Sequence, residues 1–526
     1  MKRTLHLVPF FWITFIIGVC LSRLASAQVI TSKQVDELAE RTLKTFAVPG
    51  MAVAIIKDGQ VIHAKGYGVR SLKSEEKVDA NTLFGIASNS KAFTAASLGL
   101  LVDAGKLNWD DKVIKYIPEF RLYNDYVTQE FTVRDLITHR SGLGLGAGDL
   151  MFFPNPSNFT MAEVMHNLRY LKPVSGFRTK YDYDNLLYMV AGEVVQRITG
   201  KTWGAFVEEQ IMQPLQMTRS AASWTRLQDT TNAVAAHAPL GEKVQVIKRQ
   251  LELFGSSAGG IYASIADMSK WVLMQLNHGK YGKDLEKQLF SEAVHEEMWT
   301  PQTIIPVTTR PPYNTHFSAY GLGWFLSDVK EYKQVMHTGG LAGMVSQVTL
   351  LPELQLGILV FTNQQAGAAF NAVTSTIKDS YLGIPATDRV KQISDIVKAD
   401  QAAATKITSD IWTAIAAQEK KSNRKVDLKL YTGTYHDEWF GDIIISLRNG
   451  KLWFEAQRSP RLTGQVFSYQ EQTFILKWQD RSLDADAFLT FVPNNKGLPA
   501  GIKIKPISPL TDFSYDFQDL DFQKVK

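Results

Sequence analysis

The most informative segment of this sequence is Leu83-Phe84-Gly85-Ile86-Ala87-Ser88-Asn89-Ser90-Lys91-Ala92-Phe93-Thr94-Ala95-Ala96. An extended segment turns into a helix at Ser88, and the apolar residues that follow predict a buried helix that ends at Gly105. Ser88 and Lys91 are three residues apart, so they lie on the same face of this helix. A hydroxyl beside an amine that can accept its proton is the arrangement of an activated covalent nucleophile.

The Ser-x-x-Lys spacing alone does not identify a nucleophile. The same spacing also begins at Ser74, Ser327, Ser375 and Ser422. Ser88 differs because an apolar helix follows it, which places Lys91 toward the interior rather than in water. The alternative interpretation, an ordinary helix N-cap with a solvated lysine one turn later, stays open at this point.

The length and charge of the chain limit its class. At 526 residues it is too long for one ordinary hydrophobic core, which predicts two folded domains. Lysine and arginine number 57 against 52 acidic residues, and the first 27 residues hold three of the basic ones and no acid. The remainder has 54 basic and 52 acidic residues. This balance gives no reason to expect a nucleic-acid partner.

The N-terminus has the pattern of a secretory signal peptide over residues 1–27. Lys2 and Arg3 precede an apolar run over residues 7–21, and Ala25-Ser26-Ala27 forms a small-residue cleavage site before Gln28. The alternative is an uncleaved anchor, for which the run is short against a membrane span of about 20 residues. We therefore expect a periplasmic or secreted protein with no stable membrane anchor after cleavage.

Neither a metal nor an organic cofactor is expected. Cys20 is the single cysteine and lies in the signal segment, so the chain from Gln28 has no disulfide, thiolate ligand or cysteine nucleophile. The segment 295–297 lacks the second histidine of a zincin helix, and the acidic residues at 480–486 lack the pattern of a calcium loop.

Residues 28–385 have the pattern of an α+β domain. We expect a helix over 31–46, a hairpin over 50–69, a mainly helical region between, strands over 335–362 and a helix over 369–381. Strands and helices at both ends predict one antiparallel sheet flanked by helices, with a helical lobe inserted between. The cleft between sheet and lobe is the usual place for a ligand.

The pattern changes after Pro385. Residues 386–427 are rich in Ala, Lys, Asp and Gln and predict a helical linker. Residues 428–526 have short strands at regular spacing, which predict a small all-β barrel domain. The expected strands are Leu430–Tyr435, Ile443–Leu447, Leu452–Glu455, Phe474–Trp478, Phe488–Val492 and Gly501–Ile504.

A competing nucleophile is Ser257, because Gly255-Ser256-Ser257-Ala258-Gly259 matches the nucleophile elbow of α/β-hydrolases. Residues 251–254 would be the preceding strand and His337 the base. A doubly wound fold needs alternating strands and helices here, and residues 110–330 have few buried strand patterns. We interpret the segment as a glycine-rich loop near the cleft, with the elbow as the alternative.

Two further segments would complete a site around Ser88. Tyr183 and Asn185 lie on a loop that leads into a predicted helix from Leu186. A buried ammonium favours the phenolate of a nearby tyrosine, which could then exchange protons with a serine. The alternative places Tyr183 in an aromatic surface cluster with Tyr181 and Tyr188.

The second segment is His337-Thr338-Gly339-Gly340 at the end of a predicted strand. Its glycines allow a substrate to approach the backbone closely, where an oxyanion donor is needed. The alternative is a structural histidine at a strand end.

Three ordered elements, Ser88-x-x-Lys91, Tyr183-x-Asn185 and His337-Thr338-Gly339, resemble the serine β-lactamase-like superfamily. This superfamily includes class C β-lactamases, penicillin-binding DD-peptidases, esterases and D-aminopeptidases, and the similarity extends over about residues 30–385. The resemblance implies that Ser88 is the acylated nucleophile, Lys91 its activating partner and Tyr183 the proton-shuttling phenol.

The resemblance also implies the substrate contacts. Asn185 would bind a substrate amide, and the backbone N–H groups of Ser88 and Gly340 would form the oxyanion hole. His337, Thr338 and Gly339 would form the strand that flanks the substrate. The C-terminal strands resemble the lipocalin-like domain of some of these peptidases, which would gate the cleft or mediate assembly, and an oligomer is compatible with this sequence.

One residue departs from the superfamily pattern. β-Lactamases and DD-peptidases usually have a lysine where this chain has His337, and a histidine is only partly charged near neutral pH. We therefore expect an exported serine hydrolase that cleaves an ester, amide or peptide bond in a small-molecule or short peptide substrate. The alternatives are a β-lactamase or DD-carboxypeptidase proper, and a penicillin-binding or sensor protein that is acylated without turnover.

Overall fold

A computed structural model describes residues 29–241, 243–249, 254–421 and 427–525. The predicted signal peptide and most of the strand proposed at 251–254 lie outside these residues. Within the described ranges, no helix combines the length and the apolar character needed to cross a membrane.

The first part of the chain is built on an eight-stranded antiparallel sheet with the strand order β2-β1-β14-β13-β12-β11-β10-β9. The strand nearest the N-terminus, β1, pairs with β14, so both ends of the domain contribute to one sheet. This confirms the predicted α+β class. The strands are β1 Gly50–Lys57, β2 Gln60–Gly68, β9 Thr303–Ile305, β10 Ser318–Tyr320, β11 Phe325–Val329, β12 Tyr332–Leu341, β13 Met344–Leu351 and β14 Leu356–Thr362.

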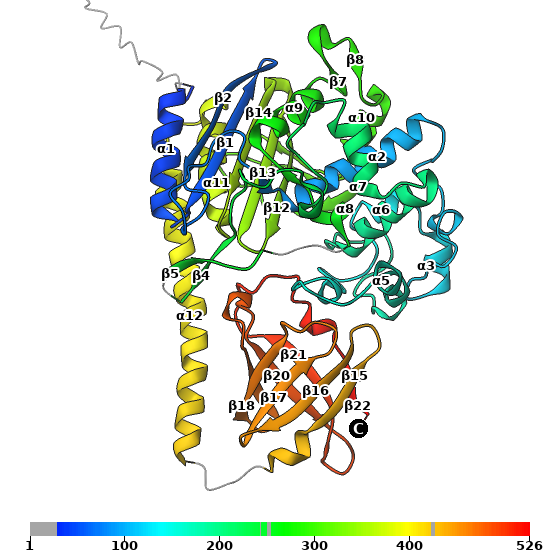
Figure 1. Ribbon diagram of the computed structural model, residues 1–526, viewed down its shortest axis with the longest axis vertical. Helices are drawn as coiled ribbons and strands as arrows, with labels where there is room; N and C mark the ends of the chain where they lie inside the picture. Colours follow the sequence, from blue (N-terminus) through cyan, green and yellow to red (C-terminus); the bar gives the residue numbers. More distant parts are fainter. Residues whose placement is uncertain (1–28, 242, 250–253, 422–426, 526) are drawn as a thin grey trace, which may run out of the picture.

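Both faces of the sheet are covered, which explains the unbroken apolar sequence of β1. Successive side chains of a strand point to opposite faces. Met51, Val53 and Ile55 pack with α1 (Ser32–Thr45) and α11 (Gly367–Tyr381), which lie together on one face in Figure 1. Ala52, Ala54 and Ile56 belong to the second core, on the side of the helical lobe.

The helical lobe lies across that second face (Figure 1). Two of its helices, α2 and α6, pack against each other and against α8. The helices are α2 Ser90–Asp103, α3 Asp125–Glu130, α4 Val133–Leu136, α5 Met161–Asn167, α6 Leu186–Thr199, α7 Trp203–Val207, α8 Ser256–Gly259, α9 Ile265–Leu276 and α10 Glu292–Met298. Short strand pairs are β3 Phe84–Gly85 with β6 Tyr262–Ala263, β4 His237–Leu240 with β5 Lys243–Val246, and β7 Lys280–Tyr281 with β8 Lys287–Gln288.

The long helix α12 (Arg389–Lys421) runs from the sheet domain along the side of a C-terminal barrel (Figure 1). The barrel is closed and has eight antiparallel strands, which confirms the predicted all-β class. Two of its strands, β18 and β22, were not predicted. The strands are β15 Gly433–Asp437, β16 Gly441–Arg448, β17 Lys451–Ala456, β18 Thr463–Gln470, β19 Thr473–Trp478, β20 Ala487–Pro493, β21 Pro499–Pro506 and β22 Phe522–Lys524.

The barrel is joined to the helical lobe by direct contacts. Arg458 forms an ion pair with Glu163, and its backbone carbonyl accepts a hydrogen bond from the Asn158 N–H at 2.9 Å. The rings of Phe153 and Tyr515 pack edge to face with centroids 4.9 Å apart. Buried residues of the barrel and of the lobe therefore belong to one continuous hydrophobic core.

Candidate active site

Ser88 lies in a short 3-10 turn, Ala87–Asn89, directly before α2. The expected helix is therefore confirmed, although its α-helical part begins two residues later than expected. Ala87 has a φ of +49°, a left-handed conformation that is costly for a residue with a side chain. The turn is fixed to β13 because Asn89 Nδ2 donates to Ser346 Oγ at 2.8 Å, and Ser346 Oγ donates to the Ile86 carbonyl at 2.7 Å.

Gly339 of β12 allows this strand to lie directly against the turn Ala87–Asn89. A Cβ atom on Gly339 would come within 2.2 Å of the Ile86 carbonyl oxygen and 3.0 Å of the Ala87 Cβ. A Cβ atom on the next residue, Gly340, would meet no atom within 4 Å, and Gly340 lines a cavity. The two glycines therefore have different roles.

Because of this difference, we expect an alanine substitution to destabilise the protein at Gly339 but not at Gly340. The new methyl group in Gly339→Ala must push β12 away from the turn Ala87–Asn89. We therefore expect a loss of about 1–3 kcal/mol in the free energy of unfolding and a fall in hydrolytic activity. Gly340→Ala, the matched control, should leave the free energy of unfolding within about 0.5 kcal/mol of the unmodified chain. Chemical denaturation of both variants is the measurement, and equal destabilisation by the two substitutions would contradict this account.

Lys91 is fully buried, and its amine lies beside the Ser88 hydroxyl. Lys91 Nζ is 3.1 Å from Ser88 Oγ, and it donates to Asn185 Oδ1 at 2.7 Å and to the Ala258 carbonyl at 2.8 Å. A buried amine held by two carbonyl oxygens has a fixed position and direction. The interpretation of Lys91 as a solvated first-turn lysine is therefore wrong.

Asn185 lies between Lys91 and a buried carboxyl group. Its Oδ1 accepts from Lys91, and its Nδ2 donates to Asp149 Oδ2 at 2.8 Å. Burial raises the pKa of Asp149 well above its ordinary value, and hydrogen bonds from Ser514 and Asn185 act in the opposite direction. The chain places Asn185 at the start of α6, as the sequence predicted.

Tyr183 is buried close to both Ser88 and Lys91. Lys91 Nζ lies 4.7 Å from the centroid of the Tyr183 ring, and a hydrogen bond joins the phenol of Tyr183 to the side chain of Ser88. Burial raises the pKa of Tyr183 far above its ordinary value, and the hydrogen bond to Ser88 offsets only part of this effect. The expectation of a favoured phenolate was wrong, because the amine faces the ring and burial dominates; Tyr183 is held as a phenol.

His337 is buried with both ring nitrogens engaged. Its Nδ1 lies 2.6 Å from the Thr338 carbonyl and its Nε2 lies 3.0 Å from the Tyr320 hydroxyl. A carbonyl oxygen can only accept, so Nδ1 carries the proton and Nε2 accepts from Tyr320. Burial lowers the pKa of His337 to about 3, and the charge of Lys91 acts in the same direction. The ring is therefore neutral at ordinary pH.

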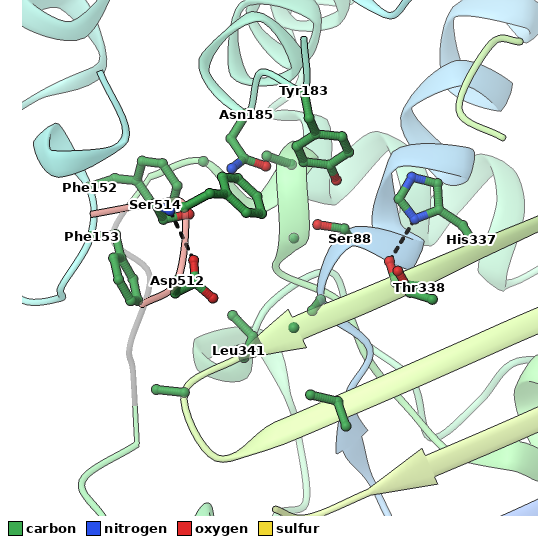
Figure 2. A pocket seen from close by; sticks show the side chains of 18 of the residues that line it. Ser88, Phe152, Phe153, Tyr183, Asn185, His337, Thr338, Leu341, Asp512 and Ser514 are labelled. Atoms are coloured by element: carbon green, nitrogen blue, oxygen red, sulfur yellow. Dashed lines mark hydrogen bonds between the residues drawn. The ribbon is translucent and has the colours of Figure 1, made fainter. Parts of the chain in front are cut away.

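Ser88 opens into a cavity of about 400 Å³ (Figure 2). In the figure, Ser88 lies between Asn185 and Tyr183 on the side of the lobe and Thr338 and Leu341 on the side of the sheet. Aromatic rings form much of the cavity wall, and Asp512 is the one charged side chain among the described residues that line it. The aromatic lining residues are Phe152, Phe153, Tyr181, Tyr183, Phe325 and Phe513.

The structure also places the glycine-rich segment around Ser257. Gly255, Ala258 and Gly259 line the cavity, as expected of a loop near the cleft. The side chain of Ser257 instead lies against Gly192 of α6, where a Cβ atom would come within 2.4 Å of Ser257 Oγ. The antiparallel sheet also has the wrong topology for an α/β-hydrolase, so the elbow interpretation is wrong.

Four groups around the site were not found from the sequence: the Ala258 carbonyl, Asp149, Tyr320 and Ser514. Each contacts a predicted site residue or its partner only through the folded chain, and Ser514 is 365 residues from Asp149. Isolated aspartate, serine and tyrosine residues give no local pattern that would have identified them.

Comparisons with known proteins match the two parts of the chain to two different families. A family model described as Beta-lactamase matches residues 35–381, and a domain of unknown function, DUF3471, matches residues 417–524. The Unguisins hydrolase ungD of Aspergillus violaceofuscus is 28% identical over 458 residues, which cover 81% of this chain and 79% of the relative. The Protein flp of Staphylococcus aureus is 26% identical over 341 residues, 63% of each chain.

Solved structures share the fold. An octameric penicillin-binding protein homologue from Pyrococcus abyssi has a TM-score of 0.59 at 19% identity, over 94% of this chain and 100% of that one. A structure titled SurE has a TM-score of 0.53 at 17% identity, over 94% and 99% of the two chains.

Proposed function

The chain belongs to the Beta-lactamase family, and from this premise we propose that it is a serine hydrolase that cleaves an ester, amide or peptide bond through an acyl-enzyme on Ser88. The observation that supports this proposal is the convergence of three groups. The amine of Lys91 and the phenol of Tyr183 both meet the Ser88 hydroxyl, and Ser88 and Tyr183 line the same cavity. The relative named as a hydrolase is in keeping with this class of reaction.

In the proposed reaction, Lys91 is the base that accepts the Ser88 proton. A neutral lysine has two N–H groups and one lone pair, and the carbonyl oxygens of Asn185 and Ala258 accept the two N–H groups. Ser88 Oγ lies 3.1 Å from the same nitrogen, so the lone pair of a deprotonated Lys91 can accept the Ser88 proton. Oγ attacks the substrate carbonyl as its proton passes to Nζ, and a new C–O bond forms.

The same groups account for the second half of the reaction. Tyr183, held as a phenol, is placed to pass a proton to the leaving oxygen or nitrogen as its bond to the acyl carbon breaks. The proton on Lys91 can then return to Tyr183 through Ser88 or solvent. We assign the oxyanion hole to the backbone N–H groups of Ser88 and Gly340, both at the cavity wall. Water then attacks the acyl carbon, its proton passes through Lys91 or Tyr183 to Ser88 Oγ as the C–Oγ bond breaks, and the carboxylic acid product leaves.

The cavity favours apolar substrates without a carboxylate. Its walls are largely apolar, His337 is neutral, and the exposed carboxylate of Asp512 would repel an anion. A fixed cation such as the lysine usual at this position would instead attract one. We therefore propose neutral or cationic esters, amides or short peptides as the substrate class.

Because His337 is neutral, we can predict how KM depends on pH. A histidine whose pKa is lowered to about 3 is almost entirely neutral from pH 8 down to 5.5, so it gains no appreciable positive charge over this interval. For an ester that carries a carboxylate far from the scissile bond, we expect KM to change less than about threefold over this interval. The matching ester without the carboxylate is the control. A KM that falls as the pH falls, for the carboxylate ester alone, would show a titrating cation in the site.

A substrate panel distinguishes the proposed activity from the family alternatives. Neutral short-chain esters, amino-acid amides and a chromogenic β-lactam are compared with a fluorescent penicillin as a covalent label. We expect turnover of a neutral ester or amide. Labelling by the penicillin without turnover of any substrate would favour a penicillin-binding or sensor protein, and efficient β-lactam hydrolysis would favour a β-lactamase.

We also propose that the protein is exported to the periplasm or beyond. The proposal rests on Lys2 and Arg3, the apolar run over residues 7–21 and the Ala25-Ser26-Ala27 cleavage pattern. N-terminal sequencing of the protein recovered from a bacterial periplasm should find Gln28 as the first residue. Recovery of the intact N-terminus in the membrane fraction would contradict cleavage.

A further inference from the structure

A loop of the barrel domain enters the cavity of the other domain. The segment between β21 and β22 places Asp512, Phe513 and Ser514 in the cavity wall, and Figure 2 shows Asp512 and Ser514 on the side opposite His337. The Phe513 ring lies 5.7 Å from that of Tyr183, centroid to centroid. The barrel therefore forms part of the site rather than a separate appendage.

Hydrogen bonds connect this loop to the nucleophile. Ser514 Oγ donates to Asp149 Oδ2 at 2.8 Å, and the same oxygen accepts from Asn185 Nδ2 at 2.8 Å. Asn185 Oδ1 in turn accepts from Lys91 Nζ at 2.7 Å, and Lys91 Nζ is 3.1 Å from Ser88 Oγ. The four residues from Ser514 to Lys91 are all buried.

Asp149 determines which end of the Asn185 amide meets Lys91. An asparagine amide has an acceptor oxygen and a donor NH₂ group of nearly equal size, so its hydrogen-bond partners decide its orientation. A flipped amide would direct its NH₂ group at the Lys91 amine and remove the acceptor that holds it. Because Asp149 Oδ2 accepts from Asn185 Nδ2, the oxygen stays toward Lys91.

The loop also fixes the position of Asp149 itself. Asp516, which follows Ser514 by two residues, accepts from the Gly148 N–H at 2.6 Å and the Leu150 N–H at 3.1 Å. These two backbone groups flank Asp149 on either side. The barrel loop thus holds both the backbone and the side chain of this residue.

We propose that Ser514 and Asp149 are positioning residues for catalysis: they orient Asn185, which holds Lys91 at Ser88. Ser514 comes from the barrel, so the two domains build the catalytic arrangement together. This inference rests on the proposed function, because it assigns these residues to the same Ser88 reaction.

The test compares two buried serines of the barrel that contact the helical lobe. Ser514→Ala removes the hydrogen bond to Asp149, and we expect kcat to fall about 10-fold while KM changes less than about threefold. Ser459→Ala is the matched control: Ser459 is fully buried and its Oγ lies 3.5 Å from the Pro154 carbonyl, away from Asn185. We expect kcat of this control to stay within about twofold of the unmodified enzyme.

A double-mutant cycle supplies the second measurement. If Ser514 acts through Asp149, the reductions in kcat caused by Ser514→Ala and Asp149→Asn should not multiply. The double variant should then have the same kcat as the less active of the two single variants. The effects of Ser459→Ala and Asp149→Asn should multiply. Equal kcat values for Ser514→Ala and Ser459→Ala, or multiplying effects in the first cycle, would overturn the inference while leaving the Ser88 reaction intact. Activity that survives loss of the Ser88 hydroxyl would instead overturn the proposed function.

Discussion

Ser88→Ala should reduce hydrolysis to the level of background. Removing the nucleophile of a serine hydrolase costs about 10⁶-fold in kcat, and the Ser88 hydroxyl is the group that lies 3.1 Å from the proposed base, the Lys91 amine. Ser88 is only partly buried and lies at the cavity surface, so its loss should leave the melting temperature nearly unchanged. Steady-state release of product from the best substrate of the panel is the measurement.

Ser257→Ala provides the matched control for this experiment. Ser257 lies in the sequence motif of a nucleophile elbow, but its side chain packs against Gly192 of α6. We expect this variant to keep kcat within about threefold of the unmodified enzyme. Full activity in Ser88→Ala, or its loss in Ser257→Ala alone, would contradict the assignment of the nucleophile.

Lys91→Met should remove nearly all activity in a chain that still folds. Methionine has a similar length and no proton-accepting nitrogen, so Ser88 loses the amine that lies 3.1 Å away. General-base catalysis contributes about 10²–10⁴-fold, and we expect a fall in kcat of at least about 10³-fold. The Asn185 and Ala258 carbonyl groups lose their donor, which costs about 1–3 kcal/mol for each buried group.

Lys378 offers a matched control for the loss of a buried lysine. It lies on α11, on the far side of the sheet, and donates to Gln334 Oε1 at 2.7 Å. Burial lowers the pKa of Lys378 to about 8. Lys378→Met should alter stability while kcat stays within about threefold of the unmodified enzyme. A similar fall in kcat for both variants would assign the effect to general destabilisation, and not to a missing base.

The predictable part of the fold was the part with strong local patterns. Strand β1 is apolar from Met51 to Ile56 because both of its faces are buried, the helix α2 is buried on nearly all sides, and α11 repeats apolar residues at helical spacing. Strands β9 and β10 have three residues each, and Ile304 of β9 is 82% exposed, so neither has an apolar pattern. Their strand conformation depends on the pairing of β9 with β10 and of β10 with β11, which only the folded sheet provides.

The same distinction holds for the site. Ser88 and Lys91 are close in sequence, and Tyr183 and Asn185 precede an evident helix, so motif spacing could propose them as candidate site residues. The protonation state of Tyr183 was not predictable, because burial by distant residues determines it. Ser514 and Asp149 meet only because the barrel folds against the helical lobe, and this contact has no signal in either local sequence.

The left-handed backbone of Ala87 has a consequence for the timing of catalysis. A residue in this conformation stores about 1–3 kcal/mol of strain, which neighbouring contacts must offset when the chain folds. The bonds from Asn89 to Ser346 and from Ser346 to Ile86 provide such contacts. The cost of aiming the Ser88 hydroxyl is thus met once, during folding, and is not repeated each time a substrate arrives. In the proposed reaction, every turnover would therefore begin with the Ser88 hydroxyl already in position to attack.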